Sequence, residues 1–486
     1  MPDYDLIIRG GTVVTESDQF RADVGVRGGR IAALAERLDG GAAPGTSVLD
    51  ATGLLVLPGG VDSHCHIEQL QQGGGADEET FTTGSTAALA GGTTSVVSFS
   101  TQFKGGGVLG PLAEYHRRAA AGAMVDYAFH QIITDPTEAV IHDELPQVVA
   151  GGVRSLKVFL TYDPLRLDDR QYLAVLSAAR RLGCLVTVHC ENYDAIAWRS
   201  AALLAAGRTA PKYHAWSRPP IVEREATHRA IALAELVDTP IEVFHVSCPE
   251  AAEEIARAQA RGVRVWGETC PQYFVLGAAD MDRPGFEGAK FMCSPAPRDA
   301  AAAAGLWQAV RARTLEVVSS DHSGWTYAGP RGKAAGGVDA PFTAIPKGVP
   351  GLAARLPLLW SEGVATGRIT ASDFVRLTAG QPARLFGLHA KGRIAPGADA
   401  DLVLWDPRRR TRLTNVLMQH AIDYTPYEGL EVTGWPVAVV RRGVVVMRDG
   451  VVQAEPGSGR YLAVPPYDMI RPRGVLPDGF DAAAFC

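Results

Sequence analysis

The chain has 486 residues, of which 47% are hydrophobic and 21% charged, so its composition is globular and excludes a mainly disordered protein. With 47 Lys and Arg against 53 Asp and Glu, and no block of basic residues, it lacks the charge pattern of a protein that binds nucleic acid or membrane surfaces. A chain of this length predicts about three domains, or one large barrel with additions.

The N-terminal residues and the cysteines predict a cytoplasmic protein. The first ten residues are acidic and contain an apolar run of only three residues, so they lack the basic start and long apolar segment of a signal peptide. No apolar stretch approaches the roughly 18 residues that span a bilayer. The seven cysteines are scattered, with no Cys-x-x-Cys motif, and we interpret them as buried, reduced thiols.

Both ends of the chain show short strand patterns separated by Gly and Asp turns. We expect one small β-sandwich formed by residues 1–54 together with 388–460. The Pro-rich tail, 461–486, is expected to be an extended packing or oligomer arm. The expected strands are 5–9, 12–15, 23–27, 30–34 and 47–50 at the N-terminal end, and 401–405, 437–441 and 443–447 at the other.

Between these ends, short apolar runs alternate with helical patterns at 168–182, 222–237 and 250–259, which is typical of repeated βα units. The segment 55–387 has a length that fits a closed (β/α)₈ barrel with insertions. The predicted fold class is therefore α/β, a barrel with a small β-sandwich made from both chain ends.

Polar side chains follow or interrupt five of the apolar runs. The carboxyl ends of barrel strands meet at one mouth, where catalytic residues gather. The sequence therefore predicts that five side chains able to bind or support a metal lie close together: His64, Lys157, His189, His245 and Asp321.

His64 and His66 flank Cys65 at a predicted strand end. Residues i and i+2 of a strand point to the same face, so both imidazoles can reach one cation. A His-x-His pair alone is also common among ordinary core or surface histidines. The histidines that follow two later strands, His189 and His245, favour a metal site.

Lys157 and Asp321 would complete such a site. Burial beside cations lowers the pKa of an amine, and a neutral amine can condense with CO₂ to a carbamate that bridges two divalent metals. The alternative is a lysine that extends to the surface. Asp321 could bind a metal and exchange a proton, or it could be an ordinary turn aspartate. His322 should point to the opposite face.

These residues belong to longer motifs that resemble the cyclic amidohydrolases, in particular the dihydropyrimidinase and hydantoinase branch. The similarity extends from about residue 4 to 460. The motifs are Pro58-Gly-Gly-Val-Asp-Ser-His-Cys-His-Ile-Glu, Ser155-Leu-Lys-Val-Phe-Leu-Thr-Tyr, Val188-His-Cys-Glu-Asn, Tyr213-His-Ala-Trp-Ser-Arg-Pro-Pro, Phe244-His-Val-Ser, Cys293-Ser-Pro, Ser320-Asp-His-Ser and Gly397-Ala-Asp-Ala-Asp-Leu-Val.

The resemblance implies a homotetramer with two metal ions per subunit, commonly zinc. It also implies hydrolysis of the ring amide of 5,6-dihydropyrimidines or 5-substituted hydantoins to N-carbamoyl amino acids by a metal-bound hydroxide. His64, His66 and Asp321 would hold one metal, His189 and His245 the other, and carboxylated Lys157 would bridge them. Asp321 would also take the proton of the metal-bound hydroxide and return it to the ring nitrogen that leaves.

Three more residues take roles from the resemblance. The hydroxyl of Tyr162 would support the developing oxyanion, and backbone groups of Ser294 would grip the ring amide. Lys347 stands where the family usually has Asn, in Ile345-Pro-Lys-Gly. If that position uses only main-chain atoms the change is tolerated, and otherwise it alters the choice of substrate.

Other activities of the same superfamily are less well supported. Dihydroorotases typically have Arg where this chain has Glu68, and allantoinases are disfavoured by Tyr162 in its Lys-x-x-x-x-Tyr context. A non-catalytic scaffold related to dihydropyrimidinase is disfavoured because all six metal-ligand candidates are present.

The segments expected to wall the pocket are 67–75 and 161–166, and the first is polar. Each methylene contact that is missing forfeits about 0.8 kcal/mol. We therefore expect small or polar rings, such as dihydrouracil or unsubstituted hydantoin, to be better substrates than 5-phenylhydantoin.

Overall fold

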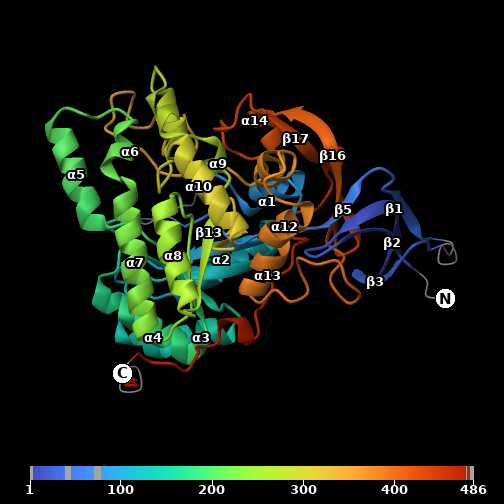
Figure 1. Ribbon diagram of the computed structural model, residues 1–486, viewed down its shortest axis with the longest axis horizontal. Helices are drawn as coiled ribbons and strands as arrows, with labels where there is room; N and C mark the ends of the chain where they lie inside the picture. The colour runs from blue at the N-terminus through green and yellow to red at the C-terminus, as the bar shows by residue number, and fades with distance from the viewer. Residues whose placement is uncertain (1–3, 39–44, 71–77, 478, 482–486) are drawn as a thin grey trace.

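The computed structural model describes residues 4–38, 45–70, 78–477 and 479–481. Two large sheets organise these residues (Figure 1). One is the parallel sheet of a barrel surrounded by helices, and the other combines strands from the two ends of the chain and lies beside the barrel. The predicted α/β class and the barrel are confirmed.

The barrel sheet has eight parallel strands in the order β6-β8-β9-β10-β11-β12-β13-β14. Its strands are short and almost wholly buried, as expected for a parallel sheet covered by helices. They are β6 (Gly60–Asp62), β8 (Thr93–Thr101), β9 (Asp126–Ile132), β10 (Ser155–Phe159), β11 (Leu185–His189), β12 (Ile241–Val243), β13 (Val265–Thr269) and β14 (Leu315–Val318).

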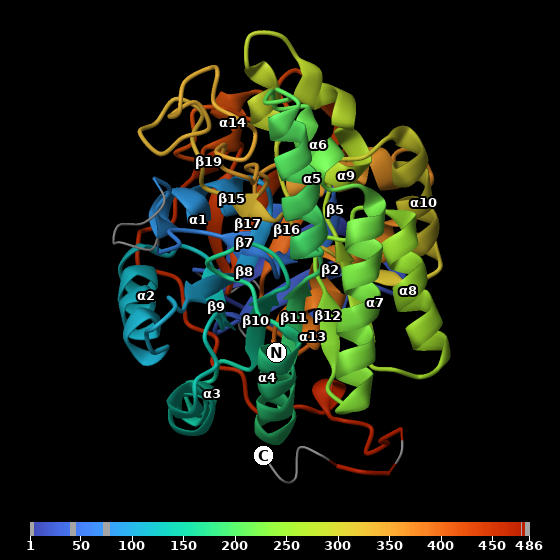
Figure 2. The same cartoon turned by 90° about the vertical axis from the view of Figure 1, so that its left-hand side faces the viewer.

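Helices on the outer side connect consecutive strands of the barrel (Figure 2). They are α1 (Phe81–Ala90), α2 (Leu109–Gly122), α3 (Leu145–Ala150), α4 (Asp169–Leu182), α7 (Pro220–Leu236), α8 (Pro249–Ala260) and α10 (Ala300–Arg311), while α5 (Tyr193–Ala205) and α6 (Tyr213–Ser217) lie between β11 and α7. Further short helices follow β14, among them α11 (Arg355–Leu359) and α13 (Gln381–Leu385).

The three helices predicted from periodicity are α4, α7 and α8. Helix α4 begins after Asp168, whose carboxylate accepts a hydrogen bond from the backbone of Gln171, and ends at Gly183, which has a φ of 67°. Helix α7 begins two residues earlier than the apolar pattern because Pro220 occupies its first turn, where no N–H is needed.

The terminal sheet contains nine strands in the order β19-β18-β17-β16-β5-β1-β2-β3, with β4 paired to β1. The segments predicted as strands 5–9 and 12–15 form one strand, because Gly10 (φ 73°) absorbs a β-bulge between them. The strands are β1 (Leu6–Val14), β2 (Gln19–Arg27), β3 (Arg30–Ala35), β4 (Ser47–Asp50), β5 (Leu55–Pro58), β16 (Leu402–Arg412), β17 (Glu431–Arg441), β18 (Val444–Arg448) and β19 (Val451–Val452).

Strand β5 joins the two ends of the chain, since it pairs with β1 on one side and with β16 on the other. The chain then turns at Gly59 and enters the barrel as β6. The division into 1–54 with 388–460, 55–387 and 461–486 stays a prediction.

A buried arginine bridges the first and last strands of the barrel. Arg355 on α11 is fully buried and donates hydrogen bonds to the carbonyls of Val61 on β6 (3.2 Å) and Val318 on β14 (3.0 Å). Its guanidinium also pairs with Asp62 at 3.4 Å. Above this point, β7 (Cys65–His66) pairs with β15 (His322–Ser323) and joins the same two edges. The side chain of Arg355 and the short β7–β15 ladder thus close the barrel between its first strand, β6, and its last strand, β14.

The tail crosses the base of the barrel (Figure 2). Tyr127 donates its N–H to the carbonyl of Arg460 and accepts from the N–H of Leu462, and the N–H of Val464 bonds to Gly152. The described part of the tail therefore packs on its own barrel. Its role as an oligomer arm stays a prediction, and residues 478 and 482–486 lie outside the described part.

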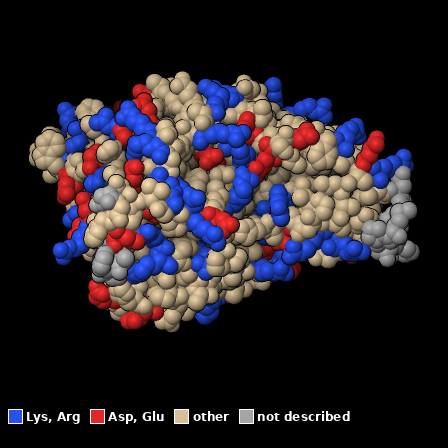
Figure 3. Space-filling view, turned by 60° about the horizontal axis from the view of Figure 1, so that its bottom comes forward, with Lys and Arg blue, Asp and Glu red and all other residues tan. Residues whose placement is uncertain are grey.

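The predicted thiols are buried: Cys65, Cys184, Cys190, Cys248, Cys270 and Cys293 are all free, while Cys486 lies outside the described residues. Within the described chain, no helix has the length and apolar character needed to cross a membrane. On the face shown in Figure 3, acidic and basic side chains are intermixed, in keeping with the nearly balanced composition.

We predict that Arg355→Met destabilises the fold by about 3–5 kcal/mol, because it leaves the Asp62 carboxylate buried without its cation. Denaturant midpoints compared at equal protein concentration measure the effect. Arg257→Met, which removes an exposed arginine of α8, is the matched control and should change stability little. Equal midpoints for the two variants would contradict the proposed role of Arg355.

Candidate metal centre and active site

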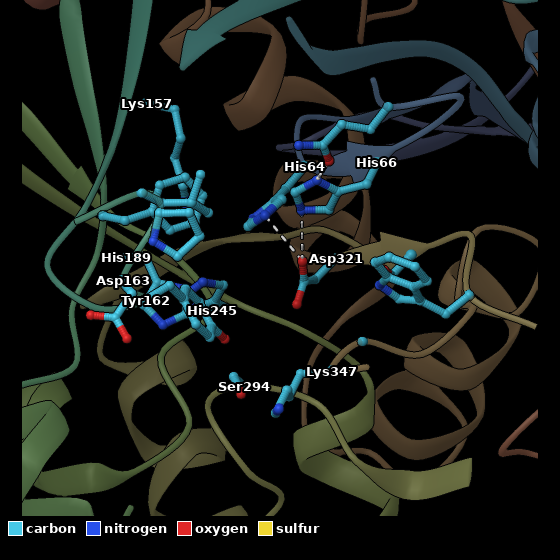
Figure 4. A pocket seen from close by; sticks show the side chains of 17 residues that line it. His64, His66, Lys157, Tyr162, Asp163, His189, His245, Ser294, Asp321 and Lys347 are labelled. Carbon is cyan, nitrogen blue, oxygen red and sulfur yellow. Dashed lines mark hydrogen bonds and ion pairs between the residues drawn. The ribbon is translucent and has the colours of Figure 1, made fainter. Parts of the chain in front are cut away.

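One cavity opens at the carboxyl ends of the barrel strands and has a volume of about 380 Å³ (Figure 4). It contains every site residue named from the sequence, although these residues come from positions up to 283 apart. They are His64, His66, Lys157, Tyr162, His189, His245, Ser294, Asp321 and Lys347.

The first group in the cavity is His64, His66 and Asp321. One carboxylate oxygen of Asp321 lies 3.1 Å from Nε2 of His64 and 3.4 Å from Nε2 of His66. Pairing of β7 with β15 brings the two segments together. The three ligand atoms lie within 4.8 Å of one another, which makes the group a candidate metal site.

The second group is His189, at the end of β11, and His245, just after β12. Their ring centroids are 4.3 Å apart, and the ring of His245 is 5.3 Å from that of His64. The two groups are therefore adjacent. Burial first, then the neighbouring cations, lower the pKa of His245 well below its usual range, so its imidazole is neutral and able to bind a metal.

Lys157 lies in the middle of β10 and is fully buried. Its amine has no hydrogen-bond partner within the described structure and lies 4.2 Å from the ring centre of Phe244 and 4.9 Å from that of Phe159. Burial lowers the pKa of this amine to about 8. A buried amine without a partner is costly, so this position suits a lysine that is modified or that supports a bound ion.

Two glutamates that the sequence patterns did not single out hold the histidines in place. Oε1 of Glu268, on β13, lies 2.7 Å from Nδ1 of His64 and accepts the backbone N–H of His245. Glu191 bonds to Nε2 of His189 and is paired with Arg218, both at 2.8 Å. A carboxylate on the second ring nitrogen fixes the tautomer and orientation of a metal-binding histidine.

The strand-end rule that located the histidines could also have indicated Glu268, which precedes the end of β13 by one residue. Glu191 lies two residues after His189, within a motif already noted. His322 points away from the cavity, as strand parity predicts: it is buried against Glu79, and its Nδ1 accepts the N–H of Gly351.

Three residues of the cavity have left-handed backbone conformations: Tyr162 (φ 69°), His245 (φ 41°) and Asp321 (φ 45°). Such conformations are unfavourable for residues other than glycine and persist where the surrounding structure imposes them. Here each occurs just beyond a barrel strand, where a sharp change of direction turns the side chain toward the cavity.

The remaining wall contains Tyr162, Ser294 and Lys347. Burial, more than any charge, raises the pKa of Tyr162, so its phenol stays protonated. Ser294 Oγ also lies 3.4 Å from Nε2 of His214. Lys347 faces the cavity beside Ser294, across from Lys157 (Figure 4).

These donors fit divalent metal ions. Imidazole nitrogens and a carboxylate are the ligands that zinc and similar ions prefer, and the partnerless amine of Lys157 lies beside them. The pocket thus combines a metal-binding group with a protonated phenol and a serine on the opposite wall. Such an arrangement can polarise a carbonyl and stabilise charge on its oxygen.

A family model described as the Amidohydrolase family matches residues 55–214 and 300–446. The chain belongs to the amidohydrolase family. This amidohydrolase is 42% identical to the D-hydantoinase of Ralstonia pickettii over 94% of its own length and 98% of the relative. It is 37% identical to the D-phenylhydantoinase of Escherichia coli strain K12, over 95% and 98% of the two chains.

Among solved structures, this amidohydrolase resembles the dihydropyrimidinase of Brevibacillus agri NCHU1002. The TM-score is 0.91 at 41% identity, over 95% of this chain and 99% of that one. The resemblance noted from the sequence motifs is therefore confirmed. Since these relatives are matched over almost their whole length, the barrel and the terminal sheet of the amidohydrolase are both included in the similarity.

We predict that Glu268→Leu weakens metal binding by about 10- to 100-fold, because His64 loses the acceptor that orients its ring. Metal affinity is measured by competition with a chelator, and circular dichroism checks the fold. Glu253→Leu, at an exposed position of α8, is the control and should bind metal as the unmodified enzyme does. Equal affinities in the two variants would rule out this role.

Proposed function

We propose that this amidohydrolase hydrolyses the ring amide of cyclic ureides and imides, namely 5,6-dihydropyrimidines and 5-substituted hydantoins, to N-carbamoyl amino acids. The observation that carries the proposal is the single cavity in which the metal-binding group, the lysine and the tyrosine–serine wall face one another. The names of the relatives, hydantoinase and dihydropyrimidinase, support it.

The proposal assigns two metal ions, most simply zinc, to the cavity. His64, His66 and Asp321 would hold one, His189 and His245 the other, and Lys157, carboxylated by CO₂, would bridge them. Bound ions supply Lewis-acid polarisation of the ring carbonyl and acidify water. The pKa of about 8 supports the lysine assignment, since a fraction of the amine is neutral near pH 7 and can react with CO₂.

The side chains of this chain then move the proton and stabilise charge. Asp321 has one carboxylate oxygen held by the two imidazoles, and the other points into the cavity (Figure 4). In this proposal, that second oxygen accepts a proton from the attacking water. It then donates the proton to the ring nitrogen that leaves. The protonated hydroxyl of Tyr162 donates to the carbonyl oxygen as negative charge develops, and Ser294 orients the ring amide.

Two alternatives remain to be tested against this function. An allantoinase, or a hydrolase of another cyclic imide, would use the same metal-binding residues. A non-catalytic scaffold would fold and assemble without bound metal. Metal analysis of the purified protein, together with turnover of dihydrouracil, hydantoin and allantoin, separates all three.

We also propose that the enzyme is a homotetramer. Helices α5 and α6 project from the barrel (Figure 1), and they carry Trp198 and Trp216, whose exposed fractions are 71% and 54%. Ile221, at the start of α7, is 56% exposed. Large apolar side chains grouped in this way are typical of an interface between subunits. A cytoplasmic location stays a prediction.

For the substrate, we predict that hydantoin and dihydrouracil have a higher kcat/KM than 5-phenylhydantoin. The polar Gln69, Asp163 and Lys347 line the cavity and favour small polar rings, whereas Leu165, within the expected segment 161–166, and Trp325, outside both expected segments, add apolar surface. Residues 71–75 of the loop lie outside the described part. Kinetics at one metal loading provide the measurement. A tenfold preference for the phenyl compound, about 1.4 kcal/mol, would reject the prediction.

Lys157→Ala should abolish nearly all turnover and lower the metal content, because two cations a few ångströms apart would lose the anion between them. Short carboxylic acids should restore part of the activity. Lys290→Ala, which removes a lysine paired with Glu287 on the surface, is the control. Two metals per chain and near-normal turnover in Lys157→Ala would disprove the carbamate.

Asp321→Asn keeps the size of the side chain and one oxygen for the metal, but the amide does not accept a proton at neutral pH. We expect kcat to fall roughly 10²-fold or more, with a smaller change in KM. Metal content is measured in parallel, since Asp321 is also a proposed ligand. A kcat within a few-fold of the unmodified enzyme would assign the proton to another group.

A further inference from the structure

The amine of Lys347 stands out among the charged groups of the cavity. Two of the described residues that line the cavity carry an amine, Lys157 and Lys347. Lys157 lies among the proposed metal ligands. Lys347 lies on the opposite wall, beside Ser294 (Figure 4), and its Nζ donates a hydrogen bond to the carbonyl of Thr343 at 2.6 Å. In its protonated form this amine has three donors, so two remain for another acceptor.

The backbone that carries Lys347 is firmly held against the Ser294 segment. The N–H of Gly348 bonds to the carbonyl of Met292 at 3.0 Å. The buried amine of Lys333 bridges the carbonyls of Met292 and Pro346, each at 2.9 Å. Lys347 is therefore fixed next to the residue proposed to orient the ring amide, and its side chain extends from a rigid wall.

The neighbouring charges do not neutralise Lys347. Arg218, which lies close enough to lower the pKa of Lys347, is already paired with Glu191 at 2.8 Å. Asp163, on the other side of the cavity, accepts the hydroxyl of Tyr193. Within the described residues, no carboxylate lies within 4.0 Å of the Lys347 amine. Burial, with a contribution from Arg218, lowers the pKa of Lys347 to about 7.

A partly buried amine on a pocket wall favours a ligand that brings a negative charge, because a charge-assisted hydrogen bond replaces the water that burial removes. A ring without a charged substituent offers Lys347 no anionic acceptor. Because the amine of Lys333 bridges two carbonyls, Lys347 is the described lysine on this wall whose amine can contact a substituent on the bound ring.

We propose that Lys347 selects cyclic ureides whose ring substituent ends in a carboxylate, such as hydantoins with a short carboxyalkyl group. This inference rests on the proposed function, because it concerns which ring the same site accepts. The carboxylate would accept hydrogen bonds from the two remaining donors of Nζ, while the ring amide lies between Ser294 and the metal-binding group.

The test compares two substrates of almost identical shape, 5-(carboxymethyl)hydantoin and 5-(carbamoylmethyl)hydantoin, with the metal-loaded full chain. We expect the acid to have at least tenfold higher kcat/KM than the amide, mainly through KM. In Lys347→Met this ratio should fall by tenfold or more, and Lys347→Arg should restore part of it. Lys212→Met, which removes a surface lysine paired with Asp282, should leave the ratio unchanged.

Each outcome decides a different point. The inference is wrong if the unmodified enzyme prefers the amide. It is also wrong if Lys347→Met lowers kcat/KM equally for both substrates, because Lys347 then does not distinguish a carboxylate from an amide. Turnover of unsubstituted hydantoin is measured in the same series. If the metal-loaded enzyme hydrolyses none of the three rings, the proposed function fails, and the inference fails with it.

Discussion

The buried pair of Arg355 and Asp62 is the interaction on which the site depends. Besides pairing with Arg355, Asp62 accepts hydrogen bonds from the backbone N–H groups of His64 (3.3 Å) and Ser320 (3.0 Å). One carboxylate thus holds the beginning of the first metal-binding segment and the residue before Asp321. Because these segments come from opposite edges of the barrel sheet, the pair closes the barrel and aligns the His64–Asp321 contact at once.

Burial and neighbouring charges together determine the protonation states of the ionisable side chains around the cavity. Ionisable groups removed from water favour their neutral forms unless a partner compensates. Asp321 is compensated by His64 and His66, which hold its pKa well below the usual range in spite of burial, and Glu191 is compensated by Arg218 and His189. Among the described residues, Lys157 contacts aromatic rings and has no such partner. The pocket therefore combines a buried carboxylate and imidazoles, which suit a metal ion, with a buried amine that has no compensating charge among the described residues.

Much of the fold and the site could be predicted because alternation and strand-end position are local properties of a sequence. His64, His189, His245 and Asp321 each follow an apolar run, and the strand-end rule brings them together. Arg355 could not be predicted, because its partners come from strands more than 250 residues apart in the chain and nothing nearby marks it as buried.

Glu268 is different, because its position next to the end of β13 could have been noticed, whereas its contact with His64 follows only from the order of the strands. The merged strand β1 shows the limit of turn signals, since Gly10 was interpreted as a break and is a bulge. The roles proposed for Tyr162 and Ser294 came from the resemblance to a family and not from periodicity or strand position, because neither pattern shows which wall of the cavity a residue lines.

The pairing of β5 with β16 has a consequence for how the protein is made. Leu55 lies opposite Trp405, so the N-terminal strands cannot complete their sheet until about 350 further residues have left the ribosome. At about 5–20 residues per second this takes roughly 20 to 70 s. During that time one edge of β5 is without its neighbour, and such edges are prone to pair with other chains. The terminal sheet is therefore a region in which nascent chains of this enzyme are exposed to misassembly until the C-terminal strands arrive.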